Sequence, residues 1–240
     1  MNNRLICVKI FEPLKASPMY NLSYFKEQDK QEILHFLHDH PFAFLTGSNS
    51  AGKQVATQIP ILVEERGGDL YLQGHIMRNT DHHKAFLENP QALAVFSGPH
   101  AYVSASWYSN PQIGSTWNYM SVHARGDISF MSDEGLIAFM KKLTLKFEKG
   151  NTSSSTFYDN LPQEFLNRMM PAITGFEIKV AELENVFKLS QNRDEKSYRN
   201  IISKLEEQGG NETMVAQEMK KRMEQLFPAG VQWDASKFIS

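Results

Sequence analysis

The side chains best suited to chemistry gather between Gly98 and Gly126, where the chain has two Trp, three Tyr, two His and one Arg. A strand that only lines a hydrophobic core is built mostly from Val, Ile and Leu, so this composition is not that of a plain core strand. Trp and Tyr combine flat apolar surface with a hydrogen-bonding group at the rim. The mixture therefore suits a flat ligand with polar edges.

A second polar stretch, Gly74–Lys84, joins the end of an expected strand to the start of an expected helix. It carries Arg78 and Lys84, and the backbone N–H groups at a helix start attract anions. The stretch could bind a phosphate group, or it could be a solvated polar turn. The residues alone weigh the two interpretations about equally.

Thr57 and Gln58 lie in a segment, Ala56–Pro60, that otherwise has the character of a buried strand. Pro60 cannot donate a hydrogen bond to a neighbouring strand, which predicts an edge strand or a bulge. Unpaired backbone groups there could face a ligand or a partner subunit. An edge strand that binds nothing is the alternative.

Two patterns resemble functional motifs without meeting their requirements. Gly47–Lys53 has the spacing of a phosphate-binding loop, but Gln54 replaces the hydroxyl residue that holds magnesium and a strand follows where a helix is needed. The pattern predicts a hairpin turn. His35, His38 and His40 lack an accompanying carboxylate-rich stretch with ligand spacing, so we expect no metal site.

The composition is that of an ordinary folded protein, with 240 residues, 41% hydrophobic residues and a formal net charge of -2. This charge gives no overall attraction to nucleic acid or to an anionic membrane. The single cysteine, Cys7, excludes an intrachain disulfide and a thiolate metal cluster, which fits a reducing compartment. No run is apolar enough for a signal peptide or a membrane span, so we expect a cytoplasmic protein that does not enter a membrane.

Alternating and apolar runs separated by turn residues predict an antiparallel barrel or sandwich. The six runs are Phe42–Thr46, Gln54–Val63, Asp69–His75, Ala92–Ser97, Ala101–Trp107 and Trp117–Phe130. The segment Ile173–Leu189 suggests a last strand pair. Residues 1–18 have no clear period and are interpreted as an extension before Met19.

Helical patterns occur before, between and after these runs. We expect helices over Asp29–Asp39, over His82–Glu88 with Asp81 as its cap, after Asp133, and near Pro162–Met170. Two amphipathic helices are predicted to close the chain, because apolar residues recur there at helical spacing. Tyr198, Ile201, Ile202 and Leu205 form the clearest such pattern.

Taken together, the motifs resemble the PaiB-type proteins, negative transcriptional regulators of bacteria that are classed with the flavin-binding split barrels. The most specific segments are Gly98–Ser104, Ser106–Tyr108, Thr116–Tyr119 and Lys188–Arg193, whose sequence is KLSQNR. The resemblance extends from Met19 to about Leu205. It implies a mainly β fold with helices (α+β), namely a six-stranded antiparallel FMN-binding split barrel with a helical C-terminal appendage.

The resemblance also implies a domain organisation and a cofactor. Residues 1–18 would be an N-terminal extension, 19–190 the split-barrel domain and 191–240 the C-terminal helical region. Two copies of the chain would form a homodimer, with FMN bound at the subunit interface. Where the family usually shows Asn-Pro-x-Trp, this chain has Thr80–His83, so it lacks one aromatic ring beside the expected flavin phosphate.

Site residues follow from the resemblance by position. The flavin phosphate and ring would contact the first long strand and the start of the barrel helix, and aromatic residues would close the pocket. The residues at those positions are Thr57, Gln58, His75, Arg78, Lys84, Trp107, Trp117 and Asn118.

The function that the resemblance implies is regulation of transcription by an FMN-binding flavoprotein. Split barrels also include FMN-dependent oxidoreductases, such as flavin reductases and pyridoxamine-phosphate oxidases, so catalysis stays open. A haem-binding stress protein, with His75, His100 or His123 as ligand, is a third alternative. Acidic residues dilute the Lys and Arg of the C-terminal helices, so we expect regulation through a partner protein or ligand and no tight DNA binding by the isolated protein.

Overall fold

Seven strands form one antiparallel sheet in the computed structural model, which describes residues 22–238. They are β1 (Phe42–Ser48), β2 (Gln54–Pro60), β3 (Leu62–Arg66), β4 (Asp69–Met77), β5 (Gln91–Val103), β6 (Thr116–Phe130) and β7 (Ile173–Lys188). The strand order is β2-β1-β5-β6-β7-β4-β3. The sheet curls until β2 meets β4 without a hydrogen-bonded ladder, and Ile59 lies against Gly74 at this contact. This half-open, curled sheet confirms the split-barrel class.

The strand count is one higher than the predicted six because Gln54–Val63 forms two strands, β2 and β3. The chain turns between Pro60 and Leu62, where Pro60 has no N–H to continue the ladder. The N–H of Ile61 instead donates to the carbonyl of Pro41, over 2.7 Å. The turn sends β2 and β3 to opposite edges of the sheet, which confirms the predicted edge strand.

Two other strand predictions were wrong in their boundaries. The predicted runs Ala92–Ser97 and Ala101–Trp107 are one strand, β5, which continues through a bulge between Ser97 and His100. The last three residues of the second predicted run, Ala105–Trp107, lie beyond β5 and form a 3-10 turn. Likewise, the expected strand pair over Ile173–Leu189 is the single strand β7. A bulge takes up an extra residue while the strand continues, so a local interruption of the alternating pattern need not mark the end of a strand.

Seven α-helices accompany the sheet within residues 22–238. They are α1 (Lys30–Asp39), α2 (Asp81–Glu88), α3 (Asp133–Phe147), α4 (Gln163–Met169), α5 (Glu195–Gln208), α6 (Gly210–Lys221) and α7 (Met223–Leu226). The predicted caps Asp81 and Asp133 were wrong by one residue, because the hydroxyls of Thr80 and Ser132 accept the free N–H groups. Each aspartate is then the first helical residue, where its negative charge interacts favourably with the positive end of the helix dipole.

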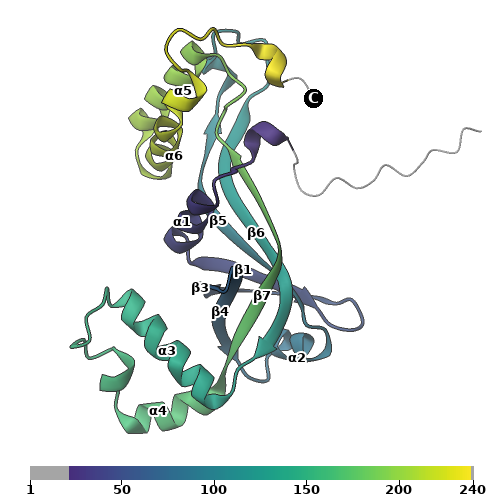
Figure 1. Ribbon diagram of the computed structural model, residues 1–240, viewed down its shortest axis with the longest axis vertical. Coiled ribbons are helices and arrows are strands. Elements are labelled where there is room, and N and C mark those ends of the chain that lie inside the picture. Colours follow the sequence, from purple (N-terminus) through teal and green to yellow (C-terminus); the bar gives the residue numbers. More distant parts are fainter. Residues whose placement is uncertain (1–21, 239–240) are drawn as a thin grey trace, which may run out of the picture.

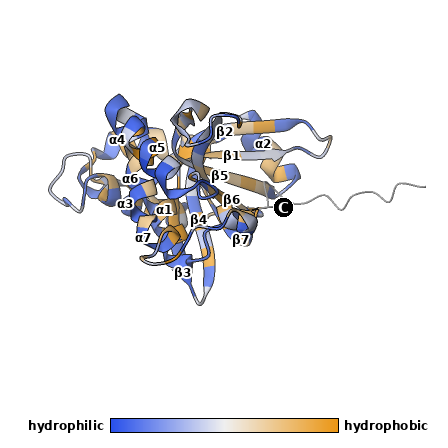
Figure 2. Ribbon diagram, turned by 90° about the horizontal axis from the view of Figure 1, so that it is seen from above, coloured by the Kyte–Doolittle hydropathy of each residue, from blue (hydrophilic) through white to orange (hydrophobic). Residues whose placement is uncertain are grey.

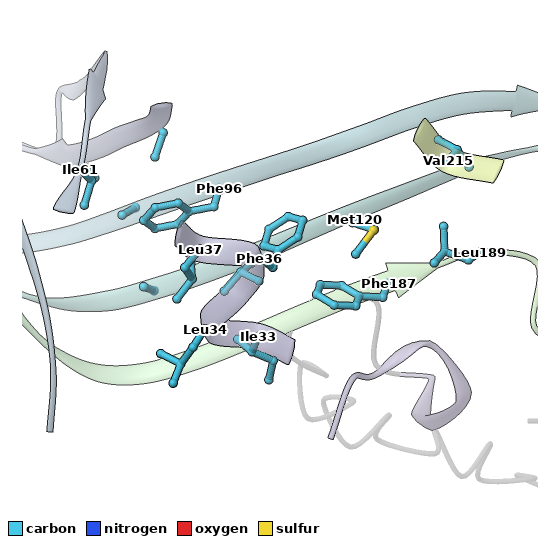
Figure 3. Packing of buried hydrophobic residues seen from close by; sticks show 14 of the residues in the cluster. Ile33, Leu34, Phe36, Leu37, Ile61, Phe96, Met120, Phe187, Leu189 and Val215 are labelled. Carbon is cyan, nitrogen blue, oxygen red and sulfur yellow. The ribbon is translucent and has the colours of Figure 1, made fainter. Parts of the chain in front are cut away.

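The hydrophobic core lies between these helices and the long strands. In Figure 3, Ile33, Phe36 and Leu37 of α1 point toward the strands that carry Phe96, Met120 and Phe187. The rings of Phe36 and Phe187 have their centroids 5.1 Å apart. Buried residues of α5 and α6 belong to the same cluster, so the C-terminal helices share the core of the barrel.

The segment Gly47–Lys53 forms the tip of the β1–β2 hairpin, as predicted, with Gly47 and Ser48 still paired to β2 and the turn following them. The side-chain oxygen of Asn49 accepts hydrogen bonds from the N–H groups of Ala51 and Lys53, and Gly52 has a φ of 79°. These contacts close a tight loop between two strands. The segment therefore lacks the helix start that a phosphate-binding loop requires.

Except for α2, the helices lie on one side of the sheet and leave most of the other side uncovered. In Figure 1 the strands β5, β6 and β7 run the length of the molecule, with α1, α3, α5 and α6 along the same side of them. Figure 2, seen from above, also shows these helices on one side, while β1, β2 and β5 reach the other side. No helix among residues 22–238 is long and apolar enough to cross a lipid bilayer.

Candidate functional site

The turn from β4 into α2 is held by its own side chains. The hydroxyl of Thr80 accepts the N–H of His83, and the carboxylate of Asp81 accepts the N–H of His82 at 2.8 Å. The N–H of Asn79, which has a φ of 65°, donates to Nδ1 of His83 over 3.1 Å. Because local groups already use these N–H donors, an anion at this turn would depend mainly on a nearby cation.

Lys84 is the cation that remains available at this turn. Its side chain is exposed and has no hydrogen bond or ion pair with any residue between 22 and 238. Arg78 is engaged elsewhere, because its Nε donates to the carbonyl of Ile173 over 2.8 Å and its guanidinium lies 3.4 Å from the carboxylate of Asp133. The two predicted phosphate ligands therefore differ, and Lys84 is the one free to bind an anion.

Thr57 and Gln58 lie on β2, beside α2 at the edge of the sheet. Consecutive strand residues point to opposite faces, so the half-buried Thr57 turns toward the barrel interior and the exposed Gln58 turns outward. Gln58 pairs with Phe44 of β1, whose ring is also exposed. Backbone groups of an edge strand that face away from its neighbour stay open to a ligand.

His75 lies in the layer between β4 and α3, with its ring 5.9 Å from that of Phe139. Its Nδ1 is buried and has no hydrogen-bond partner within the described residues 22–238. Burial lowers the pKa of His75 below its usual value, since the charged imidazolium would lose its hydration. This environment favours a neutral ring.

Mildly acidic pH is expected to destabilise the fold through such histidines. A folded-state pKa below the unfolded value of about 6.5 means that stability is present above pH 6.5 and is lost as the pH falls below it. The drop in melting temperature between pH 7.5 and pH 5.5 should be smaller in His75→Leu than in the wild type. An equal drop in both proteins would show that His75 has no part in it.

The uncovered side of the sheet carries exposed aromatic residues. Trp117 is 53% exposed, and its ring centroid lies 6.0 Å from that of His100 and 6.1 Å from that of Tyr102. Towards the middle of the sheet, a hollow of about 310 Å³ is lined by residues that include His100, Tyr119 and His123. This face offers ring surfaces and imidazole nitrogens to a ligand or a partner.

Trp107 and Asn118 have structural contacts in this chain. The backbone carbonyl of Trp107 accepts a hydrogen bond from Asn200, and its side chain packs against the core. Asn118 is fully buried, and its amide oxygen accepts the hydroxyl of Ser190 at 2.9 Å. Asn118 thus fastens β6 to the residues that follow β7 and does not point at an open site.

The predicted site residues fall into two groups within one chain. Thr57, Gln58 and Lys84 lie at the α2 end of the sheet, and Gln58 is in register with His123 on β6 through Phe44 and Val95. Trp117 is six residues from His123 along β6, or about 20 Å at the rise of a strand. One small ligand cannot contact both groups of a single chain. A shared site would require a second copy of the chain.

Some notable side chains were not among the predicted site residues. Phe42 and Phe44 of β1 are 60% and 44% exposed, because alternate residues of β1 face away from the core. Lys188 and Arg193 line a small polar pocket after β7. Their run, Lys188–Arg193, was noted in the sequence as a specific motif, but no local pattern indicated which of its side chains would face a pocket.

Comparisons with known proteins agree with this fold. Residues 19–182 match the family model described as "Putative FMN-binding domain". The chain is 32% identical over 206 residues to "Protease synthase and sporulation protein PAI 2" of Bacillus subtilis, covering 85% of this chain and 98% of that protein. It is 26% identical over 168 residues to an uncharacterized protein of Emericella nidulans, covering 58% of this chain and 67% of that protein.

Among solved structures, the FAD and heme binding protein from Mycobacterium smegmatis superposes with a TM-score of 0.52. The alignment has 17% sequence identity and covers 68% of this chain and 73% of that one. At this identity the likeness shows a shared fold.

Proposed function

The chain belongs to the PaiB-type family of FMN-binding split-barrel proteins, and we propose that it is a negative transcriptional regulator that holds FMN between two copies of the chain. The observation that carries the proposal is the family match, which spans residues 19–182 and is joined by 32% identity to a PaiB-type protein over nearly all of that protein's length. Site geometry supports the cofactor part of the proposal, and the surface charges bear on the regulatory part.

The α2 end of the sheet fits the anionic end of FMN. Lys84 supplies a cation without a competing carboxylate partner in residues 22–238, and the carboxylate of Asp81 is engaged by His82. Thr57 and the unpaired backbone groups of β2 would line the part of FMN next to its phosphate. Gln58 would contact the edge of FMN that faces the partner subunit. When bound, FMN supplies a ring that can accept or release electrons.

The dimer part of the proposal rests on the uncovered sheet face. Phe42, Phe44, Tyr102 and Trp117 are all at least 44% exposed there, and large exposed apolar residues in such number mark an interface. A second copy seated on this face would bring Trp117 of one chain toward Lys84 of the other. The two groups of site residues would then form one pocket.

Replacing Trp117 with aspartate is expected to shift the protein toward monomer, with a dimer Kd raised about thirtyfold or more, since a central aromatic contributes roughly 2 kcal/mol or more. Light scattering coupled to gel filtration measures the mass. Phe147 is 50% exposed at the end of α3 and provides the matched control, so Phe147→Asp should stay dimeric. A monomeric wild type, or equal masses for both variants, would contradict the interface.

Direct DNA binding gets little support from the surface charges of α5 and α6. Arg199, Lys204, Lys220 and Lys221 lie in ion pairs with carboxylates of the same two helices. Paired charges release few counterions from a phosphate backbone, so this surface is a poor DNA-binding face. We therefore place regulation at the level of a partner protein or a ligand.

Two measurements test the function. The purified protein should show the absorption bands of oxidised flavin, and deletion of its gene should raise a defined set of transcripts. A Soret band in place of flavin bands would favour haem binding. Rapid turnover of a reduced nicotinamide, with unchanged transcripts in the deletion strain, would favour an FMN-dependent oxidoreductase.

A further inference from the structure

A small polar pocket lies where β7 ends, at the opposite end of the sheet from Lys84 of the same chain. It has a volume of about 190 Å³ and is lined by side chains of Ser115, Thr116, Lys188, Asn192 and Arg193, together with the aromatic residues before α1. The lining offers ammonium, guanidinium, hydroxyl and amide groups. Nearly all of these groups can donate hydrogen bonds.

Within residues 22–238, the charged side chains that line this pocket are both cationic. Lys188 and Arg193 both line it, and no carboxylate residue belongs to its described lining. Nζ of Lys188 donates to the hydroxyl of Thr116 over 2.5 Å. Burial, and then the nearby charge of Arg193, lower the pKa of Lys188. An anion in the pocket would therefore meet two cationic side chains.

Arg193 also has a donor that the described chain leaves unused. Its Nε is buried and has no hydrogen-bond partner within residues 22–238, while its guanidinium lies 4.6 Å from the centre of the Tyr108 ring. A buried donor without an acceptor costs roughly 1–3 kcal/mol. An acceptor brought by a ligand would remove this cost.

The backbone between Lys188 and Arg193 is strained, and side-chain hydrogen bonds fix its conformation. Ser190 has a φ of 63°, which is unusual for a residue other than glycine, and its hydroxyl donates to the buried Asn118. The side chain of Gln191 accepts the N–H of Leu189 and donates to the carbonyl of Phe187. Strained residues that persist inside a network of hydrogen bonds are characteristic of prebuilt ligand sites.

We propose that this pocket binds a small molecule through an oxyanion, a phosphate or a carboxylate, at a site separate from that of FMN. Arg193 and Lys188 neutralise the charge, and Thr116 and Asn192 complete the donors. A pocket of about 190 Å³ is smaller than the 300 Å³ or more typical of drug-sized ligands, so the ligand has few atoms beyond the anionic group.

Inorganic phosphate and acetate are the probes that test this site, titrated separately into the full chain by calorimetry at constant ionic strength. The wild type should bind at least one of them saturably, with one site per chain. Arg193→Gln should weaken that binding about tenfold to a hundredfold, because a charge-assisted hydrogen bond is lost. Lys188→Gln provides a second variant, and melting without anion shows whether each variant is folded.

Arg199→Gln is the matched control, since Arg199 is a nearby arginine of α5 whose guanidinium pairs with Glu195 outside the pocket. It should bind the anion as the wild type does. Phosphate alone or acetate alone as the effective probe would identify which oxyanion the ligand carries. Weak, unsaturable binding that is equal in all the proteins, meaning an adventitious ion only, would overturn the proposal, and so would displacement of the anion by FMN.

Discussion

Lys84→Ala is expected to weaken FMN binding by one to two powers of ten while leaving the melting temperature of the cofactor-free protein unchanged. The flavin phosphate is a dianion, and the helix N–H groups near it already have acceptors in Thr80 and Asp81. Lys84 then provides the main compensating charge. A charge-assisted contact contributes roughly 1.5–3 kcal/mol, which gives the predicted change in Kd. Quenching of flavin fluorescence on titration measures it.

Arg78→Ala is the informative comparison for this prediction. Arg78 holds the carbonyl of Ile173 and faces Asp133, so its loss should lower the melting temperature more than it lowers FMN affinity. Lys196→Ala, at the start of α5, controls for a general change in charge. Equal FMN affinity in the wild type and Lys84→Ala would place the phosphate elsewhere.

Gly126→Ala is expected to destabilise the protein by about 3 kcal/mol or more, at the upper end of overpacking costs. Gly126 lies at the bulge where β6 shifts register against β7, and a Cβ atom there would overlap the backbone carbonyl of Lys179. Backbone in a paired strand cannot move aside as a flexible side chain can. For a chain of this size the melting temperature should fall by roughly 6–12 °C.

Gly114→Ala is the control for the glycine variant. A Cβ at Gly114 would meet no atom within 4 Å, so this substitution should leave the melting temperature within a degree or two of the wild type. A Gly126→Ala protein as stable as Gly114→Ala would mean that the bulge can widen at no cost. Thermal unfolding followed by circular dichroism distinguishes the results.

Local sequence patterns predicted which strands and helices form better than they predicted where each one begins and ends. The β1–β2 hairpin and the edge position of the strand that ends at Pro60 follow from residues a few positions apart, and both are confirmed. The continuity of β5 through Gly98 does not follow, because the bulge is held by pairing with β6, more than twenty residues along the chain. Long-range pairing overrides a local break signal.

The site residues show a similar limit. The sequence indicated Lys84 as a phosphate ligand by its place at a helix start, and the structure leaves it free for that role. Asn118 and Trp117 are adjacent, yet the period of a strand buries the first and exposes the second. Which of two neighbouring strand residues can face a ligand depends on which face of the sheet packs against the helices. The sequence of this segment does not show which face that is.

The strand order also sets the sequence of events in folding. The hairpins β1–β2 and β3–β4 join neighbouring segments and can form as soon as they are synthesised. β7 pairs with both β6 and β4, although about a hundred residues separate β4 from β7. Until Ile173–Lys188 has emerged from the ribosome, β4 and β6 keep open edges that can pair with other chains. Late synthesis of this one strand makes the incomplete chain prone to aggregation, and its pairing with β6 and β4 joins the two halves of the sheet.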